Sequence, residues 1–335
     1  MRMSVIDVGS NTIRLMVADA ERGVPLPVHT AKWKQRLSEQ ADEDGRLGEA
    51  AVAHLVRARA AAAATAERWG ADAPLAFATA VVRDAPNRQE ILQAVRSETG
   101  VPLCTLPGEV EADLTFLAAR RWMGWRSGPV ALMDIGGGSL EVAFGRGRLP
   151  DFAASLPLGA NLLTREYFAQ TDPPSAADIR ALRRRVRHEL RDVAARIRWE
   201  RPCTTVATSR TFQQLARLCG APVGRRGPFV PRRLRRGDLR RAIDELAALP
   251  AAERSQLPGI SAPRARQSLA GAIVGHTVMR LGNVKTVTIC PWALREGVLL
   301  RSIEDGAGWW SEAVRDGSAD APRCARPLHV AGPPA

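Results

Sequence analysis

Two stretches of the chain repeat one pattern of apolar and small residues. In each stretch an apolar, strand-like run ends in an aspartate, small residues follow, and a second strand-like run returns, as in VIDVGSNTIRLMVADA and ALMDIGGGSLEVAFG. Asp7-Val8-Gly9-Ser10 aligns with Asp134-Ile135-Gly136-Gly137 at a spacing of 127 residues, which is about one domain. The pattern predicts two copies of one unit, each opening with a β-hairpin. The backbone amides of two such turns, facing each other, would bind phosphate between the copies.

The remaining pattern alternates strands and helices. Apolar residues that recur every three or four positions predict helices, and short apolar runs bounded by Gly or Pro predict strands. The predicted helices are 48–69, 87–100, 108–122, 175–199, 210–220, 239–249, 266–281 and 293–305. Besides the hairpins, the predicted strands are 25–33, 74–83, 102–107, 148–160, 204–209 and 286–290. This alternation is typical of an α/β fold.

A break at 124–129 divides the pattern. We predict an N-terminal domain at 1–123 and a C-terminal domain at 124–310, and a chain of 335 residues is long enough for both. Residues 311–335, rich in Pro, Gly and Ala, predict a disordered tail.

Composition narrows the class of protein. No apolar run approaches the roughly 20 residues of a membrane span, and the N-terminus lacks a secretory signal pattern, so we expect a soluble protein without a membrane partner. The five cysteines are widely spaced and contain no CxxC, which does not favour disulfides or metal clusters and fits a reducing cytoplasm. The five histidines are scattered, and no side chains have the spacing of a covalent nucleophile with its base.

Positive charge is concentrated in one segment. The net charge is +13, and 19 arginines against four acidic residues lie between Arg180 and Arg241. Solvated helix faces with an arginine-rich codon bias would explain this, and so would a polyanionic partner. Aromatic residues are 5% of the chain, which argues against stacked single-stranded nucleic acid. Two clusters stand out, one on a predicted helix and one on a predicted loop: Arg183, Arg184, Arg185 and Arg187, and Arg232, Arg233, Arg235 and Arg236.

Eight sequence blocks, taken in order, identify a family. They are DVGSNTIRL, ATAVVRDAPN, GEVEADLTF, DIGGGSLE, SLPLGA, ATSRTFQQLARLCGA, RARQSLAGAIV and CPWALREGVLL. From about Val5 to Arg301 the chain resembles the exopolyphosphatase / guanosine pentaphosphate phosphohydrolase (Ppx/GppA) family. The resemblance implies duplicated actin-like ATPase (ribonuclease H-like) domains with an active-site cleft between them. Longer relatives carry an additional helical module, so we expect the short, two-domain form.

The resemblance also implies roles for acidic residues. Glu111 matches the catalytic glutamate, which would activate or orient water. Asp134 and Glu141, seven residues apart across the glycine turn, are further catalytic candidates and candidate ligands of Mg²⁺, with Mn²⁺ as an alternative. From the residues alone, Glu111 could instead be an acid favoured by the helix dipole, and Glu141 an exposed strand residue. Asp7 is either an acid that supports the metal ligands without itself binding the metal, or a residue that caps the turn.

Substrate contacts are expected at the two turns and at two arginines. Glycine lets the backbone approach phosphate oxygens closely, and arginine suits bidentate phosphate binding. The predicted substrate-binding residues are Ser10, Asn11, Thr12, Arg83, Gly136, Gly137, Gly138, Ser139 and Arg264. The chain departs from the family pattern at Val110, where a second glutamate is usual, and at Leu162 and Ala207.

We therefore predict a metal-dependent exopolyphosphatase that removes terminal orthophosphate from inorganic polyphosphate. The same machinery would suit removal of the 5′ γ-phosphate of guanosine pentaphosphate, in the stringent response. Alternatives of other classes are an actin-like kinase that uses ATP and a polyphosphate or alarmone sensor without turnover. A kinase is disfavoured by the lack of an adenosine-pocket signature, and a sensor by the presence of all three acids. We expect no specific nucleic acid partner, and a homodimer is left open.

Overall fold

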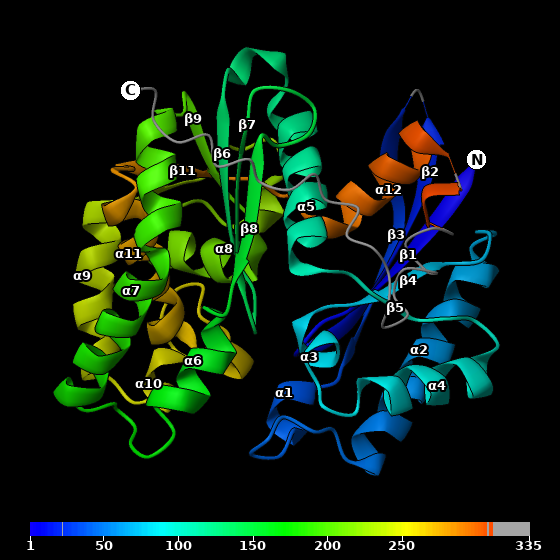
Figure 1. Ribbon diagram of the computed structural model, residues 1–335, viewed down its shortest axis with the longest axis horizontal. Coiled ribbons are helices and arrows are strands. Elements are labelled where there is room, and N and C mark those ends of the chain that lie inside the picture. Colours follow the sequence, from blue (N-terminus) through cyan, green and yellow to red (C-terminus); the bar gives the residue numbers. More distant parts are fainter. Residues whose placement is uncertain (22, 307, 311–335) are drawn as a thin grey trace, which may run out of the picture.

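The computed structural model describes residues 1–21, 23–306 and 308–310 (Figure 1). Two α/β units lie side by side, and each has its own β-sheet. The predicted tail, 311–335, lies outside the described residues. Among the helices described, none is long and apolar enough to cross a membrane.

The first half of the chain forms a five-stranded sheet with its helices. The strands are β1 (Arg2–Val8), β2 (Thr12–Glu21), β3 (Val24–Lys34), β4 (Leu75–Ala78) and β5 (Cys104–Thr105). The helices are α1 (Leu37–Gln40), α2 (Glu49–Arg68), α3 (Ala80–Arg83), α4 (Arg88–Thr99) and α5 (Gly108–Met123). The sheet order is β3-β2-β1-β4-β5, with antiparallel pairing within β1–β3 and parallel pairing from β1 through β4 to β5.

The second half forms a six-stranded sheet. Its strands are β6 (Val130–Ile135), β7 (Leu140–Gly145), β8 (Phe152–Leu156), β9 (Thr204–Ala207), β10 (Arg233–Arg235) and β11 (Thr286–Ile289). Its helices are α6 (Ala160–Tyr167), α7 (Ala176–Glu200), α8 (Ser209–Leu218), α9 (Arg236–Ala248), α10 (Ala251–Arg254), α11 (Ser268–Leu281) and α12 (Leu294–Asp305), with short 3₁₀ turns η1 (Trp125–Ser127), η2 (Gly224–Arg226) and η3 (Ala262–Arg264).

The two sheets repeat one topology. The second sheet has the order β8-β7-β6-β9-β11-β10, so its first five strands occupy the positions of β3-β2-β1-β4-β5. β6 pairs antiparallel with β7 and parallel with β9, as β1 does with β2 and β4. The internal repeat predicted from the sequence is therefore confirmed.

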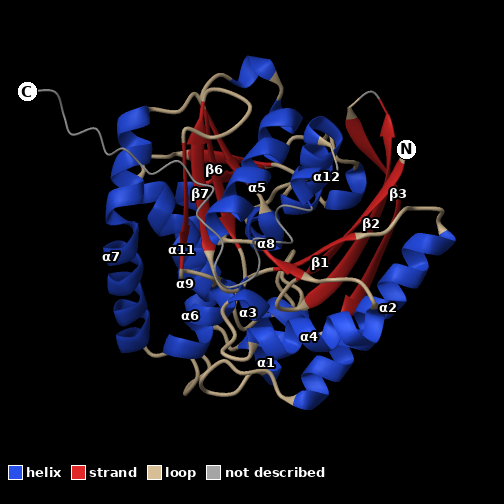
Figure 2. Cartoon of the chain, turned by 45° about the vertical axis from the view of Figure 1, so that its right-hand side comes forward, coloured by secondary structure: helices blue, strands red, loops and turns tan. Residues whose placement is uncertain are grey.

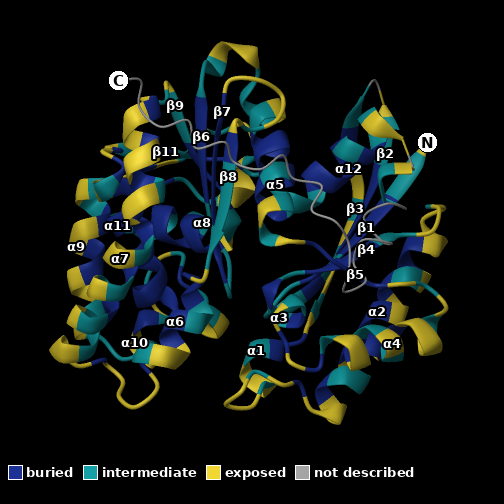
Figure 3. Ribbon diagram, in the orientation of Figure 1, coloured by how far each residue is buried: buried dark blue, intermediate teal, exposed yellow. Residues whose placement is uncertain are grey.

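Alternate residues of the central strands point to opposite faces, and each face has its own core. In β1, Ile6 packs in the cluster under α2, whereas Val5 packs in the cluster with α12. Figure 2 shows α2 and α4 on one side of β1–β3 and α12 on the other. In the second sheet, Met133 faces the core under α7 and α11, whereas Leu132 faces α5. Figure 3 shows the central strands β6 and β7 as buried and the outer helices as partly exposed.

Helix α5 lies between the two sheets. Its Leu114 packs in a cluster with Val5 and Phe77 of the first sheet, and its Phe116 in a cluster with Leu132 of the second. The N-terminus of α5, which carries Glu111, is thereby held between the two units.

Several predicted elements were wrong in detail. The strand expected at 74–83 ends at Ala78, because its partner β1 ends at Val8. Residues 80–83 form α3, and the Val82 and Arg83 amides close its turn by donating to the Thr79 carbonyl. The strand expected at 148–160 is limited to β8, and Ala160 begins α6. Of the arginine cluster expected on a loop, Arg232 does lie in the loop before β10, whereas Arg233 and Arg235 lie in β10 and Arg236 begins α9.

Candidate active site

The two hairpins place polar side chains in matching positions. Asp7 is opposite Arg14 across β1 and β2, and Asp134 is opposite Glu141 across β6 and β7. Both turns close in the same way, since the Gly9 amide donates to the Thr12 carbonyl at 3.1 Å and the Gly136 amide to the Ser139 carbonyl at 2.8 Å. Directly opposite residues of an antiparallel pair lie on the same face. Asp134 and Glu141 are therefore neighbours, as their spacing predicted.

The two turns meet each other. A Cβ atom on Gly137 would lie 2.2 Å from the Ser10 hydroxyl oxygen, so only glycine allows this approach. A hydrogen bond of 2.7 Å, donated by the side-chain Nδ2 of Asn161 to the Ser38 hydroxyl, also joins the two units. The predicted phosphate loops therefore face each other between the units.

The start of α6 orients the glycine turn. The amides of Ala160, Asn161 and Leu162 donate to the carbonyls of Gly136 and Gly137 at 2.9–3.0 Å. In a trans peptide the carbonyl and the following amide point in opposite directions. The amides of Gly137 and Gly138 therefore point away from α6. Leu162 contributes through its backbone, so this contact does not depend on its side chain.

Gly159 makes the close packing of α6 on this turn possible. An added Cβ would lie 2.2 Å from the Gly138 carbonyl carbon and 2.3 Å from the Gly137 carbonyl oxygen. The Gly159 amide also donates to the Gly138 carbonyl at 3.2 Å. The SLPLGA block thus holds the turn with its amides directed away from the helix.

The buried Glu111 and Glu141 and the partly buried Asp134 form one cluster of carboxyl groups. Glu111 and Glu141 are each 5% exposed. Burial, together with the nearby Glu141, raises the pKa of Glu111 well above its usual range. Burial and the nearby Asp134 raise the pKa of Glu141 to about 7, while burial raises that of Asp134 to about 6. Carboxylates that raise one another's pKa in this way attract cations or protons to the cleft.

Hydroxyl groups orient two of these carboxyl groups. The Ser155 hydroxyl donates to Oε1 of Glu141 at 3.0 Å, and the Thr208 hydroxyl donates to Oδ2 of Asp134. Neither Ser155 nor Thr208 was predicted from the sequence to contribute to the site. Each lies within a recognised block, SLPLGA or ATSRTFQQ, and that was the available signal.

Arg83 is held against Glu111. It lies at the end of α3 rather than on a strand, and its Nη1 donates to Oε1 of Glu111 and, at 3.2 Å, to the Leu106 carbonyl. Its Nε donates to Asp84 at 2.9 Å. The guanidinium therefore reaches the carboxylate cluster with its orientation fixed. Its predicted contact with substrate stays a prediction.

A second group of arginines surrounds Asp7. Nε of Arg295 lies 3.8 Å from Oδ2 of Asp7, and Arg14 is the cross-strand partner of Asp7. Burial raises the pKa of Asp7, while Arg295 and Arg14 oppose that rise. Arg14 and Arg295 were not predicted as site residues, although both lie in recognised blocks. Asp7 thus has cationic neighbours that Asp134 lacks among the described ion pairs.

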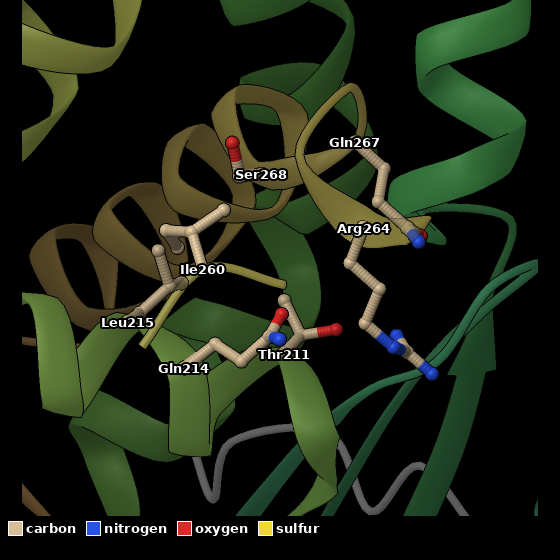
Figure 4. A pocket seen from close by; sticks show the side chains of 7 residues that line it. All are labelled: Thr211, Gln214, Leu215, Ile260, Arg264, Gln267 and Ser268. Carbon is tan, nitrogen blue, oxygen red and sulfur yellow. The ribbon is translucent and has the colours of Figure 1, made fainter. Parts of the chain in front are cut away.

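Arg264 belongs to the same group. Burial lowers its pKa to about 10, and the nearby Arg14 and Arg210 add to the effect. Figure 4 shows its guanidinium and the Thr211 hydroxyl pointing to the same side. These residues line a small pocket together with Gln214, Leu215, Ile260, Gln267 and Ser268. Arginines from separate segments that gather in one place would bind a polyanion.

The remaining predicted binding residues lie at the first turn. Ser10 contacts Gly137, as described above. Asn11 is buried, its Nδ2 donates to the Ser10 hydroxyl at 3.4 Å, and its Oδ1 has no partner among the described atoms. The Thr12 hydroxyl accepts from Nε of Arg14 at 3.4 Å. Ser139 is buried at the second turn. The predicted residues thus gather at one cleft, and their individual roles stay predictions.

A divalent cation fits the donor set of this cleft. Within the described residues, no three His, Cys, Asp or Glu side chains form a complete protein-only metal site. Asp134 and Glu141 are paired hard oxygen donors, and burial makes their negative charge costly. Mg²⁺ is commonly held by one or two carboxylates with waters and substrate phosphates. The pair therefore suits Mg²⁺ or Mn²⁺ bound with a phosphate substrate.

Comparison with known proteins identifies the family. The sequence model of the Ppx/GppA phosphatase family matches residues 16–305. The chain belongs to the Ppx/GppA phosphatase family. It is 44% identical to exopolyphosphatase 1 of Mycobacterium tuberculosis, over 92% of this chain and 90% of that relative. It is also 70% identical to an uncharacterised protein of Streptomyces coelicolor, over 99% of both chains.

Solved structures agree with the fold. The Aquifex aeolicus member of the Ppx/GppA family is 26% identical, with a TM-score of 0.76 over 92% of this chain and 99% of that chain. An exopolyphosphatase from Cytophaga hutchinsonii is 22% identical, with a TM-score of 0.82 over 91% of this chain and 98% of that chain. The predicted family and its duplicated actin-like fold are confirmed.

Proposed function

We propose that this Ppx/GppA protein is an exopolyphosphatase, which hydrolyses terminal phosphoanhydride bonds of inorganic polyphosphate and releases orthophosphate. The single observation that carries the proposal is the buried Glu111, held by Arg83 beside Asp134 and Glu141, between two facing phosphate-type turns. The 44% identity to an exopolyphosphatase supports it. A protein that only binds phosphate has no need of a buried carboxylate with a raised pKa.

Glu111 is suited to activate water. A general base works best when its pKa is near the working pH, and burial moves Glu111 in that direction. In the proposed reaction, water attacks the terminal phosphorus and gives a proton to the Glu111 carboxylate. The phosphoanhydride bond breaks, its electron pair goes to the oxygen of the shortened chain, and orthophosphate is released. Arg83, which bonds to Glu111, keeps the carboxylate in place for this transfer.

The surrounding groups stabilise phosphoryl oxygens. Amides of Gly137 and Gly138 and the hydroxyl of Ser10 would bind them from the facing turns. Arg14, Arg210, Arg264 and Arg295 would neutralise the phosphates next to the one being cut. We also propose that Asp134 and Glu141 hold Mg²⁺ or Mn²⁺, which, when bound, supplies charge neutralisation of the phosphoryl oxygens.

Substrate choice is tested by measuring phosphate release in parallel. Long-chain polyphosphate, tripolyphosphate, guanosine pentaphosphate and ATP are compared at equal concentrations of terminal phosphate. We expect the highest kcat/KM on polyphosphate. A higher value on guanosine pentaphosphate would reassign the substrate to the alarmone, and release from none of the four would overturn the hydrolase proposal.

A further inference from the structure

Five arginines of helix α7 lie on one face of the helix. Successive residues of a helix turn by about 100°, which places five arginines of α7 within a sector of about 60°. These five residues, called the arginine stripe below, are all exposed: Arg180, Arg184, Arg187, Arg191 and Arg198. The stripe extends for about 27 Å at a rise of about 1.5 Å per residue.

The acidic residues of α7 lie elsewhere on the helix. Asp178, Glu189, Asp192 and Glu200 all fall about 100° or more from the centre of the stripe. Arg185 and Arg196, which lie on their side, form ion pairs with Glu189 at 2.9 Å and with Glu200 at 2.6 Å. Within the described residues, the stripe has one ion pair, between Arg191 and the exposed Asp192 at 3.4 Å. Such sorting is not expected if the arginines merely reflect codon usage.

The arginines outside α7 do not share this arrangement. Arg232 donates to the carbonyls of Pro222, Val223, Val230 and Gly227 and so holds together the loop before β10. Arg236 donates to the Met279 carbonyl at 3.4 Å. The second cluster that stood out in the sequence is therefore at least partly structural, which leaves the α7 stripe as the stronger candidate.

The stripe ends in a basic groove of about 350 Å³. The groove lies between the C-terminal ends of α7 and α11 and the beginnings of β9 and β11. Its cationic residues are Arg198, Arg201 and Lys285, and none of the residues that line it is acidic. Arg198 belongs to both the stripe and the groove, so the two form one continuous cationic surface.

This surface begins near the catalytic end of the second sheet and leaves it. Helix α6, which orients the glycine turn, directly precedes α7 along the chain and packs against it (Figure 1). The groove touches Thr205 and Thr286, near the first residues of β9 and β11, whereas Asp134 and Thr208 lie at the other end of the parallel strands. The groove thus lies at the opposite end of the strands from the carboxylate cluster.

We propose that the arginine stripe and the groove form an exosite for inorganic polyphosphate, which binds the part of a long chain that is not in the catalytic cleft. The identity of the ligand rests on the proposed function. A polyphosphate chain is a flexible row of negative charges, and a row of exposed arginines with a single ion pair among them, that of Arg191, matches it along its length. The exosite raises the affinity of the protein for long polyphosphate chains. It leaves the affinity for short chains unchanged, because a short substrate binds only in the catalytic cleft.

The test compares a stripe variant with a matched control. The stripe variant replaces Arg184, Arg187, Arg191 and Arg198 by glutamine. The control variant makes the same change at four arginines of α2 and α4, namely Arg57, Arg68, Arg88 and Arg96. A third variant changes Arg201 and Lys285 in the groove to glutamine. KM and kcat are measured on long polyphosphate and on tripolyphosphate, and binding of long polyphosphate is measured in chelator at several salt concentrations.

We expect the stripe variant to raise KM for long polyphosphate about tenfold and to change both constants for tripolyphosphate less than twofold. Its binding should also depend less steeply on salt, by up to about one unit of log–log slope per charge removed, by analogy with nucleic acid. The groove variant should act in the same direction, and the control variant should match the wild type.

Three results would overturn the exosite: an unchanged stripe variant, an equal loss on both substrates, or an equal loss in the control. Preferential binding of RNA over polyphosphate, lost in the stripe variant, would also overturn it. Binding is measured without turnover, so failure of the hydrolase proposal is seen separately as the absence of phosphate release from every substrate.

Discussion

At the scale of residues, local sequence spacing predicted part of the site, whereas the other site residues come together only through tertiary contacts. The seven-residue spacing of Asp134 and Glu141 was enough to expect that they face each other, because one tight turn determines the register of a hairpin. Arg14, Arg210 and Arg295 lie in three distant segments and meet only after both sheets have formed. No local sequence pattern indicates that these arginines lie close together, so they were not predicted as site residues even though each lies in a recognised block.

Replacing Glu111 by Gln tests the proposed base. The amide keeps the size and polarity of the side chain but cannot accept the proton, so kcat should fall by about 10²–10⁴-fold with KM little changed. Glu109→Gln, on the exposed side of the same helix, is the control and should retain wild-type kcat. Phosphate release at saturating polyphosphate measures both. A Glu111→Gln enzyme with near-normal kcat would show that Glu111 serves the helix terminus rather than the reaction.

Metal dependence is tested at Asp134. Chelation should abolish phosphate release, and added Mg²⁺ or Mn²⁺ should restore it. Asp134→Asn removes a charge from the proposed ligand pair, so the metal concentration for half-maximal activity should rise at least about tenfold, in line with typical effects on metal sites. Asp44→Asn, in an exposed loop, should leave that concentration unchanged. Full activity of the wild type in excess chelator would exclude a metal from the reaction.

At the scale of elements, periodicity predicted type better than extent. The long helices α2, α5, α7 and α11 were expected close to their observed bounds, because their apolar positions recur at helical spacing. The apolar run at 74–83 looked like one strand, yet it contains β4 and then α3. A short apolar run is compatible with either structure, and here the strand ends because its partner β1 ends at Val8. Val8, whose carbonyl accepts from the Thr79 amide, lies 71 positions before it in the chain.

Gly159→Ala tests the packing of α6 on the glycine turn. The new Cβ would overlap the backbone of Gly137 and Gly138, so the turn must shift and its amides must change direction. We expect a loss of about 1–3 kcal/mol in the free energy of unfolding, as overpacking typically costs, and at least about a tenfold loss of kcat/KM. Gly237→Ala in α9 is the control, since its Cβ would meet nothing within 4 Å, and it should be neutral or slightly stabilising. Denaturant unfolding and polyphosphate kinetics measure these effects. Wild-type kinetics in Gly159→Ala would show that the turn tolerates the shift.

At the scale of the whole molecule, the last helix returns to the first sheet. Val298 and Leu299 of α12 pack in one cluster with Val5, Phe77 and Leu114. The division at 123/124 stays a prediction, and the chain does not simply run through the first unit and then the second. Sequence periodicity predicted α12 but did not indicate which sheet it would cover. An apolar stripe shows which face of a helix is buried, but not which surface it packs against.

The joint between α5 and α12 contains a carboxyl group whose pKa affects stability. Burial raises the pKa of Asp113 to about 6, the nearby Glu109 adds to this rise, and Arg301 of α12 opposes it. The folded pKa is above the unfolded value of about 3.9, so Asp113 favours folding below about pH 4, and that contribution is lost as the pH rises through about 6. At pH 7.5 the ionised, partly buried carboxylate therefore destabilises the joint.

Asp113→Asn should relieve that cost. Because other groups titrate as well, the informative quantity is the difference in Tm between the variant and the wild type, measured by thermal unfolding from pH 4 to pH 8. We expect the variant to gain a few degrees at pH 7.5, on the scale of about 2–4 °C per kcal/mol for larger chains, and to gain much less near pH 4. Asp244→Asn, on the exposed face of α9, is the matched control and should show no such pH-dependent gain. A difference that is constant across this range would mean that Asp113 does not change its protonation as folding buries it, and that Arg301 compensates its charge at the joint.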